Sequence, residues 1–281
     1  MFIEPDEHII LQEGDKYFSL DDLKCAEDAG IKTVLLQKCY KEDGKDGISR
    51  KIELALKTNL KILIQYYWEY KYQEIKFSDH EAAKEGDLYL YDLLRSFYDI
   101  RDRFQLIYSI PQGGEFLWDA VKTKDFPFSN DDIIRYIIDR QKILITQHGE
   151  IWLQFHNWLG HPENWNNKCL PLVYDALRKE FPDTPFYSLQ YAHFAVSGIT
   201  ETDEWLQLII KAYSNGFGIR FFVGSEYCEG LAKNTDKAIA QGAYGLVCAP
   251  IHAENPVKHD KMEEWMINSL KEANKKFNEN Y

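Results

Sequence analysis

The sequence predicts an α/β fold, a single-domain (β/α)8 TIM barrel, from three observations. Eight short apolar runs alternate with segments whose apolar residues recur at helical spacing. No linker rich in Pro, Gly or Ser interrupts this alternation. The chain has 281 residues, which is close to the length that eight strand–helix units occupy. We therefore expect residues 1–281 to form one barrel domain.

The eight apolar runs are the expected strands, because each is short and rich in β-branched or aromatic residues. The seventh run, at 220–223, stops abruptly at Gly224, Ser225 and Glu226. No G-x-G-x-x-G motif follows the first run, which disfavours the alternative of a doubly wound open sheet. The expected strands span 8–11, 31–37, 61–65, 105–110, 151–158, 186–193, 220–223 and 244–249.

A helix is expected after each strand, with boundaries set by capping residues. In the fifth helix, Pro171 is expected in the first turn, where its missing N–H costs nothing. The expected caps are Ser19 and Gly30 for the first helix, Ser129 or Asn130 at the start of the fourth, and Asn234 or Thr235 with Gly242 for the seventh.

Composition indicates a folded protein that does not bind nucleic acid. Apolar residues make up 45% of the chain and aromatic residues 15%, which is ample for a buried core. The net charge is −12, and no cluster of Lys and Arg provides the basic surface that phosphate backbones require. The five cysteines are odd in number and widely spread, as is typical of reduced thiols in a cytosolic protein.

The ends and the apolar stretches of the chain predict a cytoplasmic protein. Residues 1–7 contain neither a basic start nor an apolar h-region, and no stretch approaches the roughly 18 apolar residues of a membrane span. Secretion with prior removal of a signal peptide stays open as the alternative. No cofactor or metal is expected, and the oligomeric state is left open.

Polar and aromatic side chains gather where the expected strands end. In a barrel these exits form one face, which carries the active site. Sugars suit such a mixture, because their hydroxyls need planar hydrogen-bonding partners while their C–H faces lie on aromatic rings. Any one aromatic residue is more often part of a core, and Trp152, Trp205 and Trp265 are expected there. The candidate substrate-binding residues are Gln65, Trp68, Trp118, His156, Asn157, Trp158, Tyr191, His193, Tyr227 and His252.

Two glutamates form the candidate catalytic pair. Glu115 follows the fourth expected strand and Glu226 follows the seventh. Glycoside cleavage needs one carboxylic acid to protonate the departing oxygen and one carboxylate to attack or stabilise the anomeric carbon. Strands four and seven lie on opposite sides of a barrel mouth, so carboxylates that follow them can converge on a bound sugar.

In this arrangement the chain resembles the clan A glycoside hydrolases, the four/seven superfamily of barrel enzymes. The segment Gly224 to Tyr227 is similar to their nucleophile segment, in which Glu is often followed by an aromatic residue. The resemblance implies a retaining glycosidase acting on a β-linked saccharide or polysaccharide in carbohydrate metabolism, with Glu226 as nucleophile and Glu115 as acid/base. Gly114 stands where the family usually has the Asn that holds the sugar 2-hydroxyl, a contact left to Asn157 or Gln112.

Two other functions remain open. A metal-dependent hydrolase or isomerase is indicated by His156, His193, His252 and Glu226 at four exits, although no H-x-H motif accompanies the first strand. A non-hydrolytic carbohydrate-binding or polysaccharide-biosynthesis barrel is indicated by Gly114. The long segments at 69–87 and 115–128 favour a short or terminal substrate, and the sugar and its linkage stay open.

Overall fold

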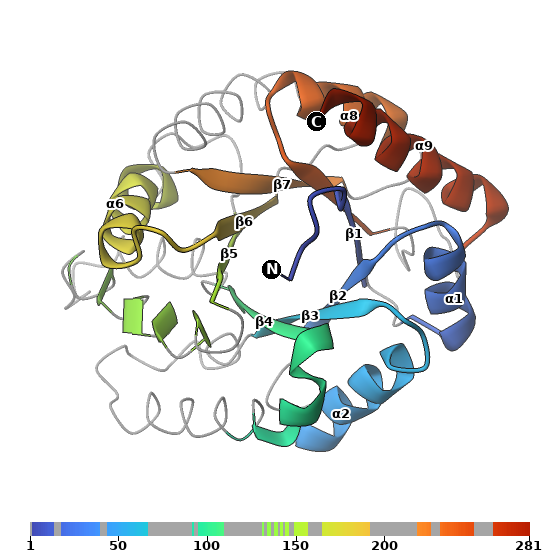
Figure 1. Ribbon diagram of the computed structural model, residues 1–281, viewed down its shortest axis with the longest axis horizontal. Coiled ribbons are helices and arrows are strands. Elements are labelled where there is room, and N and C mark those ends of the chain that lie inside the picture. The colour runs from blue at the N-terminus through green and yellow to red at the C-terminus, as the bar shows by residue number, and fades with distance from the viewer. Residues whose placement is uncertain are drawn as a thin grey trace.

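A computed structural model describes residues 2–13, 18–39, 44–66, 92, 95–109, scattered helical positions between 131 and 145, and residues 149–156, 165–191, 218–225, 231–249 and 261–281. Within this part of the chain, eight parallel strands close into a barrel in sequence order, from β1 next to β2 round to β8 next to β1. Figure 1 looks into the ring of strands, with helices around its outside. The predicted (β/α)8 barrel is therefore confirmed.

All eight expected strands are present, and their boundaries lie close to those predicted. The largest difference at a strand start is in β2, which was expected from residue 31 and begins at Thr33. The strands are β1 (Ile9–Gln12), β2 (Thr33–Cys39), β3 (Lys61–Tyr66), β4 (Phe104–Ser109), β5 (Ile151–His156), β6 (Phe186–Tyr191), β7 (Ile219–Ser225) and β8 (Gly245–Cys248).

The described helices cover the outside of the barrel. Ser19 caps α1 as predicted: its hydroxyl accepts from the Asp22 N–H at 3.2 Å, and the Ser19 N–H donates to Asp22 Oδ2 at 2.9 Å. Gly30 follows α1 with a φ of 80°, which the absence of a Cβ permits. The elements are α1 (Leu20–Asp28), α2 (Gly44–Ala55), the 3-10 helix η2 (Tyr98–Arg103), α6 (Trp165–Glu180), α8 (Leu231–Ala240) and α9 (Glu264–Asn280).

Two predicted helix starts are wrong. The helix α6 begins at Trp165, so Pro171 lies beyond its first turn, and a proline there removes one N–H donor without ending the helix. The helix α8 begins at Leu231, so neither Asn234 nor Thr235 is its cap. Instead, the Thr235 hydroxyl donates to Leu231 O at 2.7 Å within the helix, which satisfies it without a capping role.

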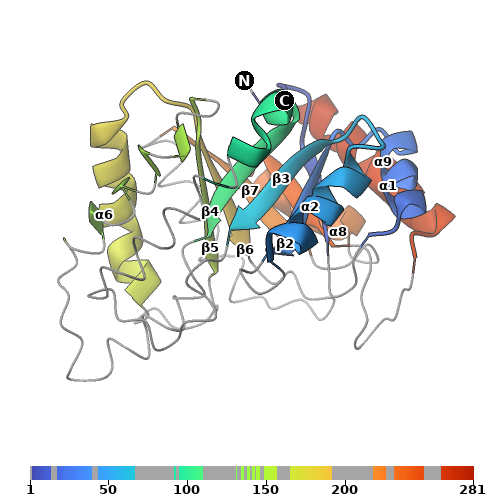
Figure 2. The same ribbon diagram turned by 90° about the horizontal axis from the view of Figure 1, so that it is seen from below.

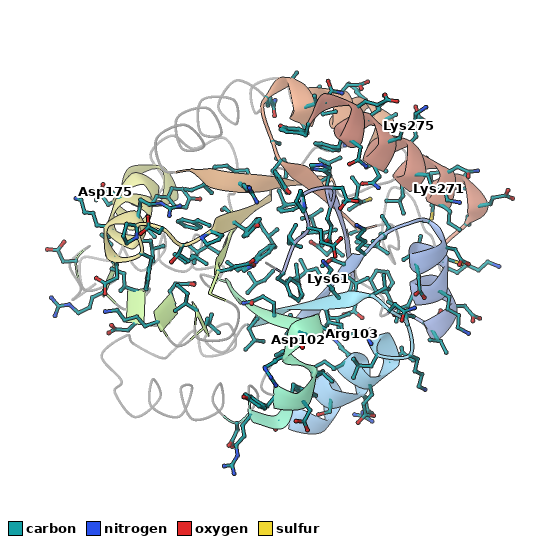
Figure 3. The ribbon with its side chains drawn as sticks, viewed as in Figure 1. Lys61, Asp102, Arg103, Asp175, Lys271 and Lys275 are labelled. Atoms are coloured by element: carbon teal, nitrogen blue, oxygen red, sulfur yellow. The ribbon has the colours of Figure 1, made fainter. Side chains whose placement is uncertain are left out.

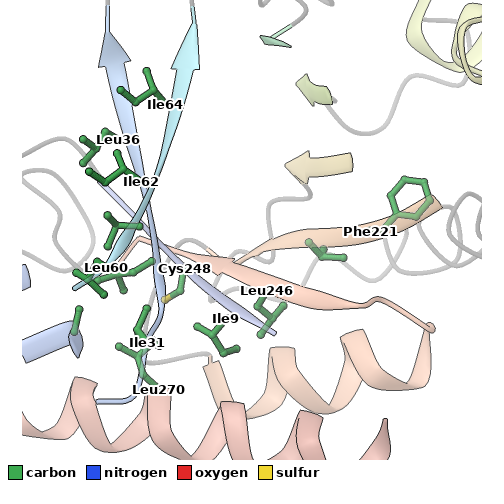
Figure 4. Packing of buried hydrophobic residues seen from close by; sticks show 14 of the residues in the cluster. Ile9, Ile31, Leu36, Leu60, Ile62, Ile64, Phe221, Leu246, Cys248 and Leu270 are labelled. Atoms are coloured by element: carbon green, nitrogen blue, oxygen red, sulfur yellow. The ribbon is translucent and has the colours of Figure 1, made fainter. Parts of the chain in front are cut away.

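The described strand side chains are mostly apolar on both sides of the sheet, because one side faces the barrel interior and the other the helices. An outer layer, shown in part in Figure 4, contains residues such as Ile62, Ile64 and Leu246 packed against helical residues such as Leu270. The interior cluster comprises Phe2, Ile3, Ile10, Leu35, Leu63, Ile107, Trp152, Tyr187, Leu189, Phe222 and Val247.

Trp152 is a core residue, as predicted. It is 1% exposed, and its ring stacks on Tyr187 with centroids 4.6 Å apart and on Phe222 at 6.2 Å. Its indole N–H donates to Glu150 Oε2 at 3.2 Å, so the ring is buried without an unpaired donor. Trp265 packs partly buried against the outer layer, and Trp205 lies outside the described residues.

The amino-terminal segment closes one end of the barrel. Phe2 belongs to the interior cluster, and its N–H donates to Glu150 Oε1 at 2.7 Å. Lys61 Nζ, near the centre of the ring in Figure 3, donates to Phe2 O at 2.6 Å and to Glu7 Oε2 at 2.7 Å. Glu7 also accepts from the Thr33 hydroxyl. Because both glutamates are buried, these partners are what makes their burial tolerable.

His8 lies beside this closed end, packed among aromatic rings. Its Nδ1 is 2.6 Å from Tyr244 O, and since a carbonyl only accepts, Nδ1 carries the proton. The rings of Phe277 and Tyr281 stack on it with centroids 5.4 Å away in each case. Burial lowers the pKa of His8 below its ordinary value of 6.5, so the folded protein favours the neutral ring.

The free energy of unfolding is expected to fall as the pH drops from about 7.5 to 5, because the unfolded chain takes up a proton at residue 8 more readily than the folded protein. The His8→Gln variant keeps an N–H donor for Tyr244 O and removes this protonation. We therefore expect its urea midpoint to depend less on pH than that of the wild type over this range. Parallel curves for the two proteins would contradict the assignment.

Glu4 and Asp6 lose their charge at lower pH than His8 gains its own, so they do not contribute to the difference measured between about pH 7.5 and 5. Hydrogen bonds from Lys32 lower the pKa of Glu4 and of Asp6 below their ordinary values of 4.5 and 3.8. Their contribution to stability is present above those values and is lost only as the pH falls through the lowered pKa values.

Two further expectations concern cysteines and membranes. In the described part of the chain, Cys25 is a free thiol and Cys248 is buried in the outer layer. None of the helices described there has the length and apolar character that a membrane span requires.

Candidate functional site

The carboxyl ends of the eight strands form one rim, and the amino-terminal segment occupies the other end of the barrel. In Figure 2 the chain's N-terminus is at the top and the arrow of β3 points towards the opposite end. Active sites of such barrels lie at the carboxyl ends of the strands, where the loops that follow them meet. The candidate site therefore belongs to this rim, which we call the carboxyl rim.

Three predicted substrate-binding residues have a described backbone at the carboxyl rim. Gln65 is the residue before the end of β3, His156 ends β5 and Tyr191 ends β6. His156 and Tyr191 are register partners of neighbouring strands, so their backbones lie side by side. Gln65 pairs with Ile107 of β4, on the other side of β4 from β5. The side chains of these three residues lie outside the described part.

The other predicted site residues lie outside the described residues altogether, and their roles stay predictions. They are the two candidate catalytic residues, Glu115 and Glu226, together with Trp68, Trp118, Asn157, Trp158, His193, Tyr227 and His252.

The strands nevertheless fix where the chain leaves the barrel before each glutamate. The strand β7 ends at Ser225, so Glu226 is the next residue of the chain. The strand β4 ends at Ser109, and Glu115 follows 115 − 109 = 6 residues later. Between β4 and β7 stand β5 and β6, so the two exits belong to separate parts of the same rim. This is the topology that a pair of convergent carboxylates requires.

The exit of β1 carries two buried polar residues that sequence reasoning missed. Gln12 is 6% exposed and has the same strand parity as Ile10 of the interior cluster, so it belongs to the inner side of the barrel wall. Glu13 has the opposite parity. Its Oε1 accepts from the Phe18 N–H at 3.3 Å, and its Oε2 lies 3.3 Å from Lys51 Nζ of α2.

These contacts give the two residues different roles. Glu13 is 2% exposed, and a buried carboxylate needs its ion pair, so Glu13 and Lys51 hold the start of α1 and α2 against the exit of β1. Among the described side chains at the carboxyl rim, Gln12 is polar and lies on the inner side of the barrel wall. The strand β1 extends one residue beyond the predicted end at Leu11. Because side chains along a strand point to alternate sides, this extension places Gln12 on the same side as Ile10.

Among the described residues, no group of three or more His, Cys, Asp or Glu side chains lies close enough to hold a metal ion. The residues of the metal-dependent alternative, His156, His193, His252 and Glu226, have side chains outside that part of the chain.

No protein-family model matches the sequence, and no curated protein matches it. Three solved structures illustrate what the fold is similar to. The mannotriose complex of Thermomonospora fusca beta-mannanase has a TM-score of 0.57 and 12% identity, over 94% of this chain and 85% of that one. A trimodular GH5_4 subfamily endoglucanase has a TM-score of 0.61 and 12% identity, over 96% of this chain and 60% of that one.

An L-ribulose 3-epimerase has a TM-score of 0.54 and 11% identity, over 98% of this chain and 94% of that one. At such identities the likeness shows a shared fold. Because glycosidases and an epimerase share this fold, the chemistry must be argued from the residues at the carboxyl rim.

Proposed function

We propose that this protein is a retaining glycoside hydrolase that cleaves a β-linked saccharide, with Glu226 as nucleophile and Glu115 as acid/base. The observation that carries the proposal is the end of β7 at Ser225, which makes Glu226 the first residue after a strand of a closed barrel. Position 226 also has the parity of Phe222 in the interior cluster, so an extended course beyond β7 would direct it towards the mouth.

The chemistry requires the two carboxyl groups to differ in protonation. Glu226 must be ionised to attack the anomeric carbon, while Glu115 must be protonated to give its proton to the departing oxygen. The same Glu115, once ionised, removes a proton from the water that releases the sugar. A separation of about 5 Å between the two carboxyl groups goes with this retaining mechanism, whereas roughly 6.5–9.5 Å goes with inversion.

Sugar recognition is assigned to side chains at or beyond the carboxyl ends of the strands. The aromatic residues Trp68, Trp118 and Trp158 would stack on sugar rings, and Gln65, His156 and His193 would bind hydroxyls. Gln12 joins this set because it lies on the inner side of the wall at the exit of β1. Like Asn157 and Gln112, it is a candidate for the 2-hydroxyl contact that Gly114 cannot make.

The test is hydrolysis of β-linked substrates followed by proton NMR of the first anomer released. The structural similarity to a mannanase in complex with mannotriose and to an endoglucanase selects β-manno- and β-gluco-oligosaccharides and their aryl glycosides for the first panel. We expect turnover in which the β-anomer appears first and the α-anomer follows only by mutarotation. Release of the α-anomer first would contradict retention.

The same assay separates the two alternatives. Turnover that is lost in a chelator and restored by zinc or manganese would favour the metal-dependent hydrolase or isomerase. Saturable saccharide binding without turnover across the whole panel would favour the non-hydrolytic barrel.

A further inference from the structure

A pocket of about 390 Å³ opens near the amino-terminal ends of β6 and β7, where α6 turns into β6. These strand starts lie at the end of the barrel opposite the carboxyl rim, and the pocket is distinct from the proposed glycosidase site. Its lining includes two arginines, Arg178 and Arg220, together with Asp183, Thr184, Phe186 and Gly218.

The guanidinium group of Arg178 is held in one place. Its Nη1 donates to three carbonyl oxygens after the end of α6: Phe181 at 3.2 Å, Pro182 at 3.1 Å and Thr184 at 2.8 Å. Its Cζ lies 5.7 Å from the centroid of the Phe186 ring. A guanidinium that is already ordered loses little conformational entropy when it binds a ligand.

Arg220 is ordered by aromatic rings. Its Nη1 donates to the Tyr187 hydroxyl at 3.1 Å, and its Cζ lies 5.7 Å from the Tyr187 centroid and 5.1 Å from that of Tyr244. Burial and the nearby Glu150 carboxylate raise the pKa of Tyr187 to about 12, so this phenol stays neutral and does not cancel the charge of Arg220. Arg220 itself is exposed, which leaves it accessible from solvent.

The charge of the lining selects an anion. Among the described lining residues, two arginines and one aspartate are charged, a sum of 2 − 1 = +1 in a chain whose net charge is −12. Gly218 has a φ of 63°, a left-handed conformation that favours glycine. Planar guanidinium groups match the oxygens of a phosphate group, and the Thr184 hydroxyl offers a further donor.

We propose that this pocket binds a phosphate group, either as free phosphate or as the phosphomonoester of a small molecule. The pair of ordered guanidinium groups supplies the affinity, and Asp183 weakens it by its negative charge beside Arg178.

The experiment is isothermal titration calorimetry with inorganic phosphate and with phenyl phosphate, at constant ionic strength. We expect saturable binding by the wild type, weakened about tenfold or more in Arg220→Gln because a charge-assisted hydrogen bond is lost. Arg220→Lys should recover only part of the loss, since lysine keeps the charge without the planar fork. Tighter binding of phenyl phosphate than of phosphate would identify a phosphomonoester as the ligand, and equal binding would identify free phosphate.

Two further variants keep the test decisive even when the Arg220→Gln protein does not fold. Lys179→Gln removes one positive charge from the exposed side of the same helix, where Lys179 pairs with Asp175, and should leave the affinity unchanged. Asp183→Asn removes the negative charge of the lining and should tighten binding several-fold. The proposal is overturned by absent binding in the wild type, by equal affinity in a folded Arg220→Gln protein, or by unchanged affinity in Asp183→Asn.

Discussion

Replacing Glu226 with alanine is expected to lower kcat/KM for an aryl β-glycoside by at least roughly 10⁴-fold, on the scale of removing a covalent nucleophile. Without this carboxylate no glycosyl-enzyme can form, so the pathway loses the step that the proposed mechanism depends on. Azide is small enough to occupy the vacated space and attack in its place. We expect azide to restore turnover and to give the glycosyl azide of inverted configuration.

Glu115→Ala should behave differently, because an acid matters only where the leaving group needs a proton. For an alkyl or saccharide leaving group we expect a loss of roughly 10²–10⁴-fold, whereas a dinitrophenyl glycoside should form the glycosyl-enzyme at close to the wild-type rate. Azide should then yield the glycosyl azide of retained configuration. This contrast between the two variants assigns each glutamate its role through the products as well as the rates.

The matched control is Glu229→Ala, which removes a carboxylate three residues after Glu226 in the same segment of the chain. It should retain activity within a few-fold of the wild type if Glu226 is the nucleophile. A wild-type rate in Glu226→Ala combined with a large loss in Glu229→Ala would move the nucleophile to position 229 and contradict the assignment.

The barrel could be predicted because its signal is repeated and needs no tertiary information. A parallel strand in a barrel is covered on both sides, so the run from Lys61 to Ile64 reads as continuously apolar after its first residue, and the same holds for 221–223 in β7. Polar residues interrupt these runs only at their ends. A strand boundary is therefore visible as a change in composition, which explains why the predicted strands agree so well with the structure.

Helix starts and buried polar contacts carry weaker sequence signals. Thr235 has the chemistry of a capping residue, but its hydroxyl bonds within α8, and the sequence alone does not distinguish these uses. Gln12 was missed because the first run was expected to end one residue earlier. Arg178 and Arg220 are 220 − 178 = 42 residues apart, so no local motif joins them, and only the barrel brings both into one pocket.

Gly245→Ala is expected to lower the free energy of unfolding by at least about 3 kcal/mol, the upper range for overpacking a core. A Cβ at this position would lie 2.2 Å from His8 O and 2.7 Å from Phe222 Cε1. The same His8 carbonyl, just before β1, accepts the Leu246 N–H of β8 at 2.8 Å. The methyl group would therefore push apart the two strands that close the barrel. Urea unfolding followed by circular dichroism measures the loss.

Gly30→Ala is the matched control, since nothing lies within 4 Å of a Cβ at position 30 and its cost comes from the φ of +80°. We expect about 1–2 kcal/mol there, the penalty of a left-handed conformation for an L-residue. In the Gly245→Ala background, Phe222→Leu should recover only part of the loss, because it relieves the side-chain contact and leaves the backbone contact with His8 in place. Full recovery would show that Phe222 alone requires glycine, and a loss no larger than that of Gly30→Ala would mean that β1 and β8 separate at little cost.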